Sequence, residues 1–364
     1  TYNGDDAQKK IRKESLQSMV RQTGRYQAMR EERLSALLEK VNEQHELMLS
    51  DWDIENLLQE SQKAGRISRL VSGKSITADK GKKYKAIMAG DHWDELASSY
   101  KMFQKDIMKE MNTAVEMLVF DYGAAGEKKV TMTPLDSIKY HRRFMQTGIL
   151  AIDPKTGEIK TWVGGINNKY FQFDHIGSSR QVGSTFKPFV YATAITLQGI
   201  SPCFPVLDQP YTIAPGDGSF GVLEPWTPQN ADGKFTNRNY TLFEGLKDSR
   251  NTISVFLMQQ LGNANVVRGL VHNMGIDSSL RRADGEYRVP NQPSICLGSA
   301  DLSVMEMTGA YCTFANNGVF VKPYFVSSVE DENGRVIYRA MKEEQVALPP
   351  KANAVMVDML KYTA

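Results

Sequence analysis

The sequence predicts an α+β protein with a mostly helical region over residues 1–114 and a mixed domain over residues 115–364. Charged residues make up nearly a third of the chain before about residue 145 and under a fifth after it. In the first region, apolar residues recur at the period of roughly 3.6 residues that places them on one helix face. The second region adds short apolar runs bounded by Gly and Pro, which are typical of strands and hairpins. We therefore expect a helical linker or docking module followed by a mixed domain.

The composition bounds the classes of function. A chain of 364 residues can hold one large domain and a smaller one. Its net charge of +2 gives no general attraction to nucleic acid or to a membrane. The five histidines are scattered and the three cysteines are widely spaced, so we expect no metal site and no cofactor. No run approaches the ~20 apolar residues that a membrane span needs.

Helical periodicity covers most of the first region. The stretches that carry it are residues 11–20, 34–47, 52–58 and 100–115. Ser50 and Asp51 predict an N-cap for the third of these helices. Residues 64–90 are rich in Lys, Gly and Ser, and they predict a loop or flexible arm. This region contains no constellation of catalytic residues.

Two hairpins and a helix are predicted next. Each hairpin consists of two short apolar runs on either side of a turn that contains glycine. The first hairpin joins residues 117–123 to residues 129–133, and the second joins 149–153 to 158–164. Residues 134–145 lie between the hairpins and predict a helix that leads into the main domain.

The strongest chemical signal lies in residues 180–189, where Gly183 precedes Ser184 and Lys187 follows three residues later. Positions three apart share one face of a helix, so Lys187 can reach the Ser184 oxygen. A serine becomes a nucleophile when a base takes its proton, and a desolvated lysine can be neutral enough to do so. The start of the apolar helical stretch 189–197 adds free backbone N–H groups and the positive end of the helix dipole. The pattern indicates a serine that can be acylated.

A bare Ser-x-x-Lys is a weak signal, because Ser98 and Lys101 form the same pattern in a charged helical stretch. There we expect a solvated helix face with no chemistry. Taken alone, Ser184 and Lys187 would more readily fit a helix N-cap with a surface lysine. A second motif separates the two sites, because the polar run Ser249-Arg250-Asn251 follows between two apolar segments. That run alone would also fit a capped loop before a helix.

Ser-x-x-Lys followed by Ser-x-Asn belongs to the signature of penicillin-binding proteins and class A β-lactamases. Roughly residues 115–364 resemble the transpeptidase domain of class A (bifunctional) penicillin-binding proteins, with the matching stretches in the expected order. These stretches are 148–154 with Gly157, 162–165, 180–189, 226–230, 249–251, 297–298, and Tyr311 with 314–318. The resemblance implies the penicillin-binding protein/β-lactamase-like fold, an antiparallel sheet flanked by helices. Residues 149–153 and 158–164 would be its first two strands.

The resemblance also implies a two-step acyl transfer. Ser184 would attack the penultimate D-Ala of a peptidoglycan stem peptide, and Lys187 would accept its proton. Ser249 would relay a proton to the departing D-Ala, and Asn251 would hold the amide of the acyl chain. An amine from a neighbouring stem peptide would then convert the acyl-enzyme into a cross-link. Arg250 is expected to form an exposed salt bridge and has no assigned chemistry.

The third motif of the family, Lys-Thr-Gly, is expected on a strand well after Ser-x-Asn. The run Lys155-Thr156-Gly157 has the right residues, but it precedes Ser184 and follows Pro154, so turn chemistry explains it. The true motif is expected soon after Lys361, beyond the last residue, Ala364. The family's glycosyltransferase domain and N-terminal membrane anchor are likewise expected outside this chain.

Two other functions remain open at this point. A class A β-lactamase would need a deacylating glutamate after Ser-x-Asn, where Glu286 and Glu306 lie without the surrounding pattern. A β-lactam sensor or scaffold would be acylated without forming cross-links. The leading hypothesis is a DD-transpeptidase with stem peptides as substrates, β-lactam antibiotics as inhibitors and cell-wall synthesis proteins as partners. It implies a location at the periplasmic face of the inner membrane and no nucleic-acid partner.

Overall fold

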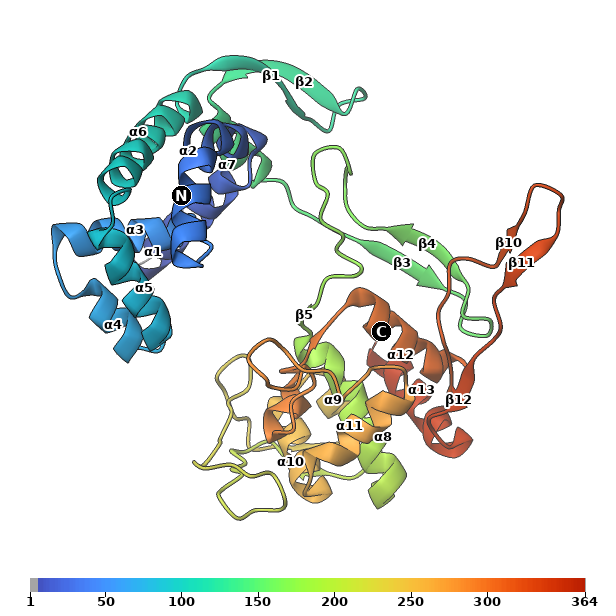
Figure 1. Ribbon diagram of the computed structural model, residues 1–364. Helices are drawn as coiled ribbons and strands as arrows, with labels where there is room; N and C mark the ends of the chain where they lie inside the picture. The colour runs from blue at the N-terminus through green and yellow to red at the C-terminus, as the bar shows by residue number, and fades with distance from the viewer. Residues whose placement is uncertain (1–5, 364) are drawn as a thin grey trace. The chain divides into compact units, whose positions relative to one another are not determined.

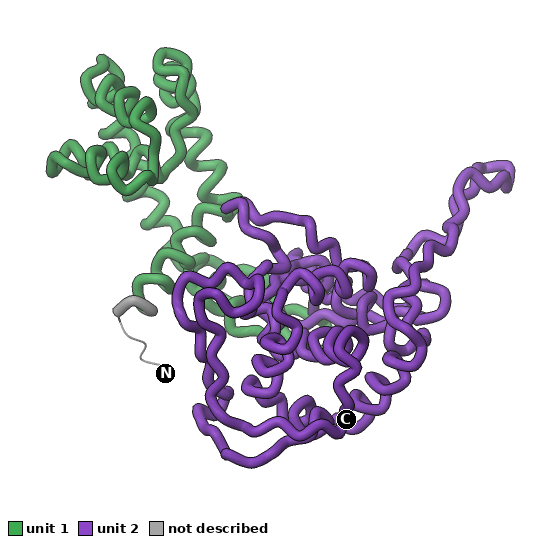
Figure 2. The backbone as a smooth tube through the Cα atoms, turned by 90° about the horizontal axis from the view of Figure 1, so that it is seen from below, with its two compact units in different colours: residues 1–145 green, residues 146–364 purple. Residues whose placement is uncertain are grey.

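The computed structural model describes residues 6–363, and contacts divide the chain into two compact units (Figures 1 and 2). Unit 1 ends at Met145 and unit 2 begins at Gln146. Both helices and strands are present, so the predicted α+β class is confirmed. Within the described part of the chain, no helix combines the length and the apolar character needed to cross a membrane.

Unit 1 is a helical bundle with one hairpin. Its elements are α1 (Asp6–Arg21), α2 (Gly24–His45), α3 (Asp51–Gln62), α4 (Arg66–Ser72), α5 (Ala78–Ala89), α6 (Trp93–Met111), β1 (Val115–Phe120), β2 (Glu127–Met132) and α7 (Pro134–His141). The predicted cap of α3 is confirmed, because the Ser50 Oγ accepts a hydrogen bond from the Asp53 backbone N–H while the Asp53 carboxylate accepts one from the Ser50 N–H. This reciprocal pairing satisfies two backbone donors at the start of the helix.

The prediction of a loop over residues 64–90 is wrong, because α4 and α5 occupy most of it. The Thr77 side chain caps α5 by accepting the Lys80 backbone N–H. Ile67 and Tyr84 are buried in the core of unit 1. The sequence pattern does not reveal these short helices, because arginines in α4 and lysines in α5 dilute the few apolar residues that are buried.

The structure ends the helical part after Met145, whereas the sequence places the boundary at 114/115. The predicted hairpin forms as β1 and β2, and the predicted helix forms as α7. The Tyr140 hydroxyl of α7 donates a hydrogen bond to the Phe120 carbonyl of β1 at 2.8 Å. Leu135 and Ile138 pack against the helical core of unit 1. The hairpin therefore belongs to unit 1 through the helix that follows it.

Unit 2 contains the candidate motifs. Its helices are η1 (Gly183–Phe186), α8 (Lys187–Gln198), α9 (Leu242–Lys247), α10 (Asn251–Leu261), α11 (Ala264–Asn273), η2 (Pro293–Leu297), α12 (Val304–Ala315) and α13 (Pro350–Thr363). Its strands are β3 (Ile149–Ile152), β4 (Ile159–Val163), β5 (Arg180–Gln181), β6 (Val206–Leu207), β7 (Asn239–Tyr240), β8 (Asp301–Leu302), β9 (Val319–Val321), β10 (Ser328–Glu330), β11 (Val336–Arg339) and β12 (Glu344–Val346).

The named strands pair in twos, and every pair is antiparallel. The second predicted hairpin is confirmed as β3 and β4, with Ile149 opposite Val163. Helix α12 packs against β3. Asp153 Oδ1 accepts the backbone N–H groups of Lys155 and Thr156 between the two strands. This confirms that the early Lys-Thr-Gly is a turn.

Helix α8 is the central element of unit 2. Residues 187–194 are all buried, and α10, α11, α13 and η2 pack around them (Figure 1). A helix that is apolar on all sides is stable only inside such a layer. The first residue of this buried helix is Lys187, so the fold draws a lysine into its core.

Candidate active site

The Ser184 turn is held from one side by the segment that follows η2. The Val182 backbone N–H donates to the Ala300 carbonyl at 3.1 Å, and the Gly183 N–H donates to the Gly298 carbonyl at 3.0 Å. Gly183 has φ +56°, a left-handed conformation that glycine adopts without a steric cost. The chain then makes the η1 turn, which leaves Ser184 exposed directly before α8.

Glycine is required at position 298 by a close approach of two backbones. Gly298 has φ +76°, and a Cβ there would lie 1.8 Å from the Gly183 carbonyl oxygen. We expect Gly298→Ala to destabilise unit 2 by about 1–2 kcal/mol for the left-handed backbone and about 1–3 kcal/mol more for overpacking. Gly285→Ala is the matched control, because φ is +86° there but nothing lies within 4 Å of the added carbon. Thermal unfolding of both variants checks this, and equal losses would contradict it.

Lys187 joins the two sequence motifs. Its side chain is fully buried, at 0% exposure. The ammonium Nζ donates to the Ser249 carbonyl at 2.6 Å, to Ser249 Oγ at 3.1 Å and to Asn251 Oδ1 at 2.7 Å. The structure therefore brings Lys187, Ser249 and Asn251 together across more than 60 residues of sequence. Ser184 lies on the same turn of chain but is exposed, and these three bonds of Nζ run to the Ser-x-Asn motif rather than to it.

Burial makes the Lys187 amine a weak base for a lysine. Removal from water lowers the pKa of Lys187 to about 8. A negatively charged Cys296 would raise the pKa of Lys187, whereas the positive charge of Arg250 lowers it further. Burial raises the pKa of the Cys296 thiol, so the thiol is neutral near neutral pH. A substantial neutral fraction of Lys187 near neutral pH is what a general base at this position needs.

The Ser-x-Asn turn has an uncommon backbone. Ser249 has φ +51°, the left-handed region that few non-glycine residues adopt. Asn251 starts α10, and its side chain also donates to the Gln229 carbonyl at 2.7 Å. The strained serine places both its carbonyl and its hydroxyl on Lys187. Strain of this kind concentrates at functional sites.

The prediction that Arg250 forms an exposed salt bridge is wrong. The side chain is buried, and Nη2 pairs with Asp208 at 2.7 Å. Nη1 pairs with the half-exposed Asp232 at 3.0 Å. Sequence reasoning missed Asp208 altogether, since a lone Asp before Gln209 and Pro210 looks like turn chemistry. It passed over Asn230 as well, although the 226–230 stretch was singled out.

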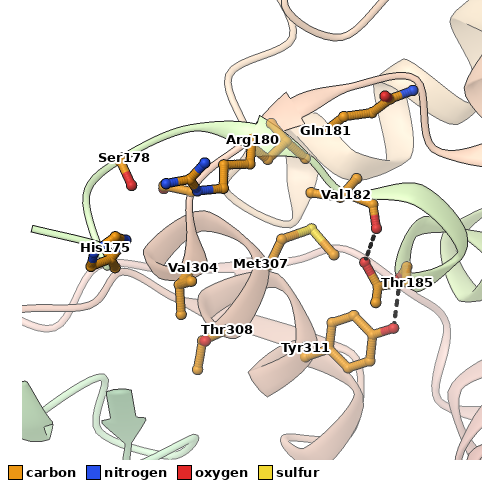
Figure 3. Close-up of a pocket in the computed structure, with 12 residues that line it drawn as sticks. His175, Ser178, Arg180, Gln181, Val182, Thr185, Val304, Met307, Thr308 and Tyr311 are labelled. Carbon is orange, nitrogen blue, oxygen red and sulfur yellow. Dashed lines mark hydrogen bonds between the residues drawn. The ribbon is translucent and has the colours of Figure 1, made fainter. Parts of the chain in front are cut away.

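A cavity of ≈ 510 Å³ borders the Ser184 turn (Figure 3). It lies between β5, η1 and α12, and the residue after the serine, Thr185, lines it. Tyr311 of α12 donates its hydroxyl hydrogen to the Thr185 carbonyl at 2.7 Å, and Thr185 Oγ1 donates to the Val182 carbonyl at 2.7 Å (Figure 3). Val182 and Met307 give one wall an apolar surface. Ser184 itself is not among the residues that line the cavity.

The competing motifs occupy structural positions. Ser98 and Lys101 are exposed on α6, as a solvated face requires. Glu306 caps α12 through Ser303 and pairs with Arg288 at 2.8 Å, so its carboxylate is engaged away from the lysine. In the described residues, no group of three or more His, Cys, Asp and Glu side chains is placed to hold a metal ion.

Comparison with known proteins identifies the family of the chain. Residues 147–362 match the family described as the penicillin binding protein transpeptidase domain, and residues 77–145 match the penicillin-binding protein middle domain. Penicillin-binding protein 1A of Aquifex aeolicus is 34% identical over 220 residues, 60% of this chain and 28% of that protein. Penicillin-binding protein 1A of Rickettsia conorii is 34% identical over 200 residues, 55% of this chain and 23% of that protein. The chain thus spans about a quarter of the length of these curated relatives.

A solved structure gives a weaker likeness. The PonA1 protein from Mycobacterium tuberculosis, in complex with penicillin V, is 24% identical and has a TM-score of 0.49. The match covers 73% of this chain and 67% of that chain.

The end of the match to the penicillin-binding protein middle domain coincides with the end of unit 1 at Met145.

Proposed function

The chain belongs to the penicillin-binding protein transpeptidase family, and from this premise we propose that it is a peptidoglycan DD-transpeptidase that acts through Ser184. The observation that carries the proposal is the arrangement around Lys187. A fully buried amine contacts Ser249 and Asn251 and lies one turn from an exposed serine. Nucleophile, base and proton relay are the parts that serine acyl transfer needs.

The proposed reaction has two steps. Ser184 Oγ attacks the carbonyl carbon of the penultimate D-Ala while neutral Lys187 Nζ takes the hydroxyl proton. The peptide C–N bond then breaks, and the terminal D-Ala leaves after its nitrogen receives a proton through the Ser249 hydroxyl. In the second step, an amine of another stem peptide attacks the ester and releases Ser184. In this proposal, the backbone N–H of Ser184 stabilises negative charge on the carbonyl oxygen.

The test is incubation with penicillin G followed by intact-mass measurement and peptide mapping. We expect one persistent adduct per chain, located on the peptide that contains Ser184. Release of D-Ala from a synthetic stem peptide, with an added amine acceptor, measures cross-linking directly. Rapid multiple turnover of nitrocefin would contradict a transpeptidase and indicate a β-lactamase. Penicillin labelling without any release of D-Ala would indicate a sensor or scaffold.

We infer that the chain works outside the cytoplasm, at the periplasmic face of the inner membrane, because the proposed stem-peptide substrates lie there. β-Lactam antibiotics are the proposed inhibitors, and proteins of cell-wall synthesis are the proposed partners. Protease treatment of intact spheroplasts tests the location. Digestion of the protein in intact spheroplasts supports the inference, and protection until lysis would contradict it.

The rate of acylation is expected to rise with pH around the pKa of Lys187. Only the neutral amine accepts the Ser184 proton, and its fraction grows as the pH passes through about 8. At pH about 7 the rate constant is therefore expected to be about tenfold below its alkaline plateau. Stopped-flow acylation with a fluorescent penicillin measures this. A flat profile between about pH 6 and 9 would show that Lys187 is not the base.

A further inference from the structure

Asp208 is a buried carboxylate that accepts five hydrogen bonds. It follows β6 directly and is 0% exposed. Oδ1 accepts from Asn230 Nδ2 at 2.9 Å and from Thr252 Oγ1 at 2.6 Å. Oδ2 accepts from the Thr236 N–H at 2.9 Å, from Thr236 Oγ1 at 2.7 Å and from Arg250 Nη2 at 2.7 Å. Although burial alone would raise the pKa of Asp208, these bonds hold it well below its ordinary value, so the group stays ionised.

Asp208 and its partner Asn230 form hydrogen bonds to one side of the Ser249–Asn251 turn. Arg250 is the central residue of that turn and donates directly to the carboxylate. Asn230 connects Asp208 to the next two residues. Its Nδ2 donates to Asp208, and its Oδ1 accepts the backbone N–H groups of Asn251 at 2.8 Å and Thr252 at 3.3 Å. Every residue from 250 to 252 is therefore tied to Asp208, either directly or through one amide.

The other side of the same turn faces Lys187. The Ser249 carbonyl, the Ser249 hydroxyl and the Asn251 amide oxygen all accept from Lys187 Nζ. Ser249 has a left-handed conformation at this position, with φ +51°. A serine persists in such a conformation when the surrounding structure determines it. The fixed residues on its C-terminal side supply that constraint.

We propose that Asp208 is a positioning residue of the acyl-transfer site, which holds the Ser249–Asn251 turn against Lys187. It acts through Arg250 and Asn230, and it contacts neither Ser184 nor the cavity beside it among the described contacts. The effect of Asp208 on catalysis rests on the proposed function. Its effect on the surroundings of Lys187 does not depend on that function. This role makes the carboxylate part of the site although 42 residues separate it from Arg250.

Two effects follow from the loss of the carboxylate charge. The charged or titratable groups that influence Lys187 are Arg250 at the start of α10 and Cys296 on η2. Without Asp208, the positive charge of Arg250 is less compensated and opposes the ammonium form of Lys187. A loosened turn also withdraws the three oxygens that accept from Nζ. Both effects lower the pKa of Lys187 below about 8.

The test replaces Asp208 by Asn, which keeps the shape and removes the charge. We expect the plateau rate constant of penicillin acylation to fall about 100-fold, as a misplaced catalytic group predicts. We also expect the midpoint of its pH profile to move to lower pH. Lys187 is followed independently by NMR of ¹³Cε-labelled lysine, with its signal assigned by its loss in Lys187→Met.

Asp53→Asn is the matched control, because Asp53 is also a buried ionised carboxylate, at 2% exposure, but lies in unit 1. It is expected to lower the unfolding temperature and leave the acylation profile unchanged. If Asp208→Asn also lowers only the unfolding temperature and leaves the acylation profile unchanged, the proposal is overturned.

If Asp208→Asn does not fold, the acylation rate of Thr252→Val tests the proposal instead. We expect it to lose about tenfold in rate, as for one hydrogen bond to a charged group, and an unchanged rate would overturn the proposal.

The two proposals fail in different ways. If the unmodified chain is not acylated on Ser184, the proposed function fails. The NMR titration of Lys187 then still tests the positioning role. A lower titration midpoint in Asp208→Asn supports the role, and an unchanged midpoint overturns it.

Discussion

Ser184→Ala is expected to abolish the covalent penicillin adduct while leaving the fold intact. The side chain is exposed and lies in the short η1 turn, so its removal costs little stability, within about 0.5 kcal/mol. The ester cannot form without the hydroxyl oxygen. Loss of a catalytic nucleophile lowers rates by a factor on the order of 10⁶, which takes acylation below detection by intact mass.

Ser98→Ala is the matched control for this experiment. Ser98 has the same Ser-x-x-Lys pattern and is also exposed, but it lies on α6 in unit 1. The control is expected to label like the unmodified chain. An adduct that persists in Ser184→Ala would place the nucleophile elsewhere and sink the assignment, provided that thermal unfolding shows both variants to be folded.

Lys187→Met is expected to give the second-largest loss. Methionine fills a similar volume but cannot take the Ser184 proton, so the acylation rate constant should fall about 10²–10⁴-fold. The pH dependence near the midpoint of about 8 should disappear with it. The substitution removes a buried charge, but it also leaves the Ser249 carbonyl and Asn251 Oδ1 without their donor. These two effects on stability oppose each other. The unfolding temperature is therefore expected to change little, although the acylation rate constant falls strongly.

Stopped-flow acylation and thermal unfolding measure the two quantities separately. Lys101→Met is the control, because this exposed lysine completes the Ser98 pattern on α6. It is expected to leave both quantities unchanged. A Lys187→Met variant that is acylated within tenfold of the unmodified rate would exclude Lys187 as the general base.

Much of the fold could be predicted because its signals are local. The Ser50 cap, the two hairpins and the turn at Lys155 depend on residues within a few positions of one another. The two helices at 64–90 could not be predicted because they are short. Their stability comes from Ile67 and Tyr84, which pack against residues far away in sequence in the core of unit 1. Most helical stability comes from such packing rather than from local propensity.

The candidate site also has one part that local sequence patterns predict and one part that depends on distant packing. Ser184, Lys187, Ser249 and Asn251 were identified from motif spacing and family resemblance, and the structure places the last three in one hydrogen-bonded group. Their catalytic roles stay predictions. The burial of Arg250 and its pairing with Asp208 carried no sequence signal. An arginine in a polar run looks exposed until the surrounding chain supplies buried partners.

The residues of this chain were therefore enough to predict an α+β protein, an acylatable serine and its companion motif. Only the tertiary structure shows that Lys187 is fully buried, that it contacts residues 62 and 64 positions away, and that Arg250 between those residues pairs with the buried Asp208. The physical reason is range. Capping, periodicity and turns act between neighbours, whereas burial of a charge and the partners that stabilise it depend on which distant segments the packed core brings together.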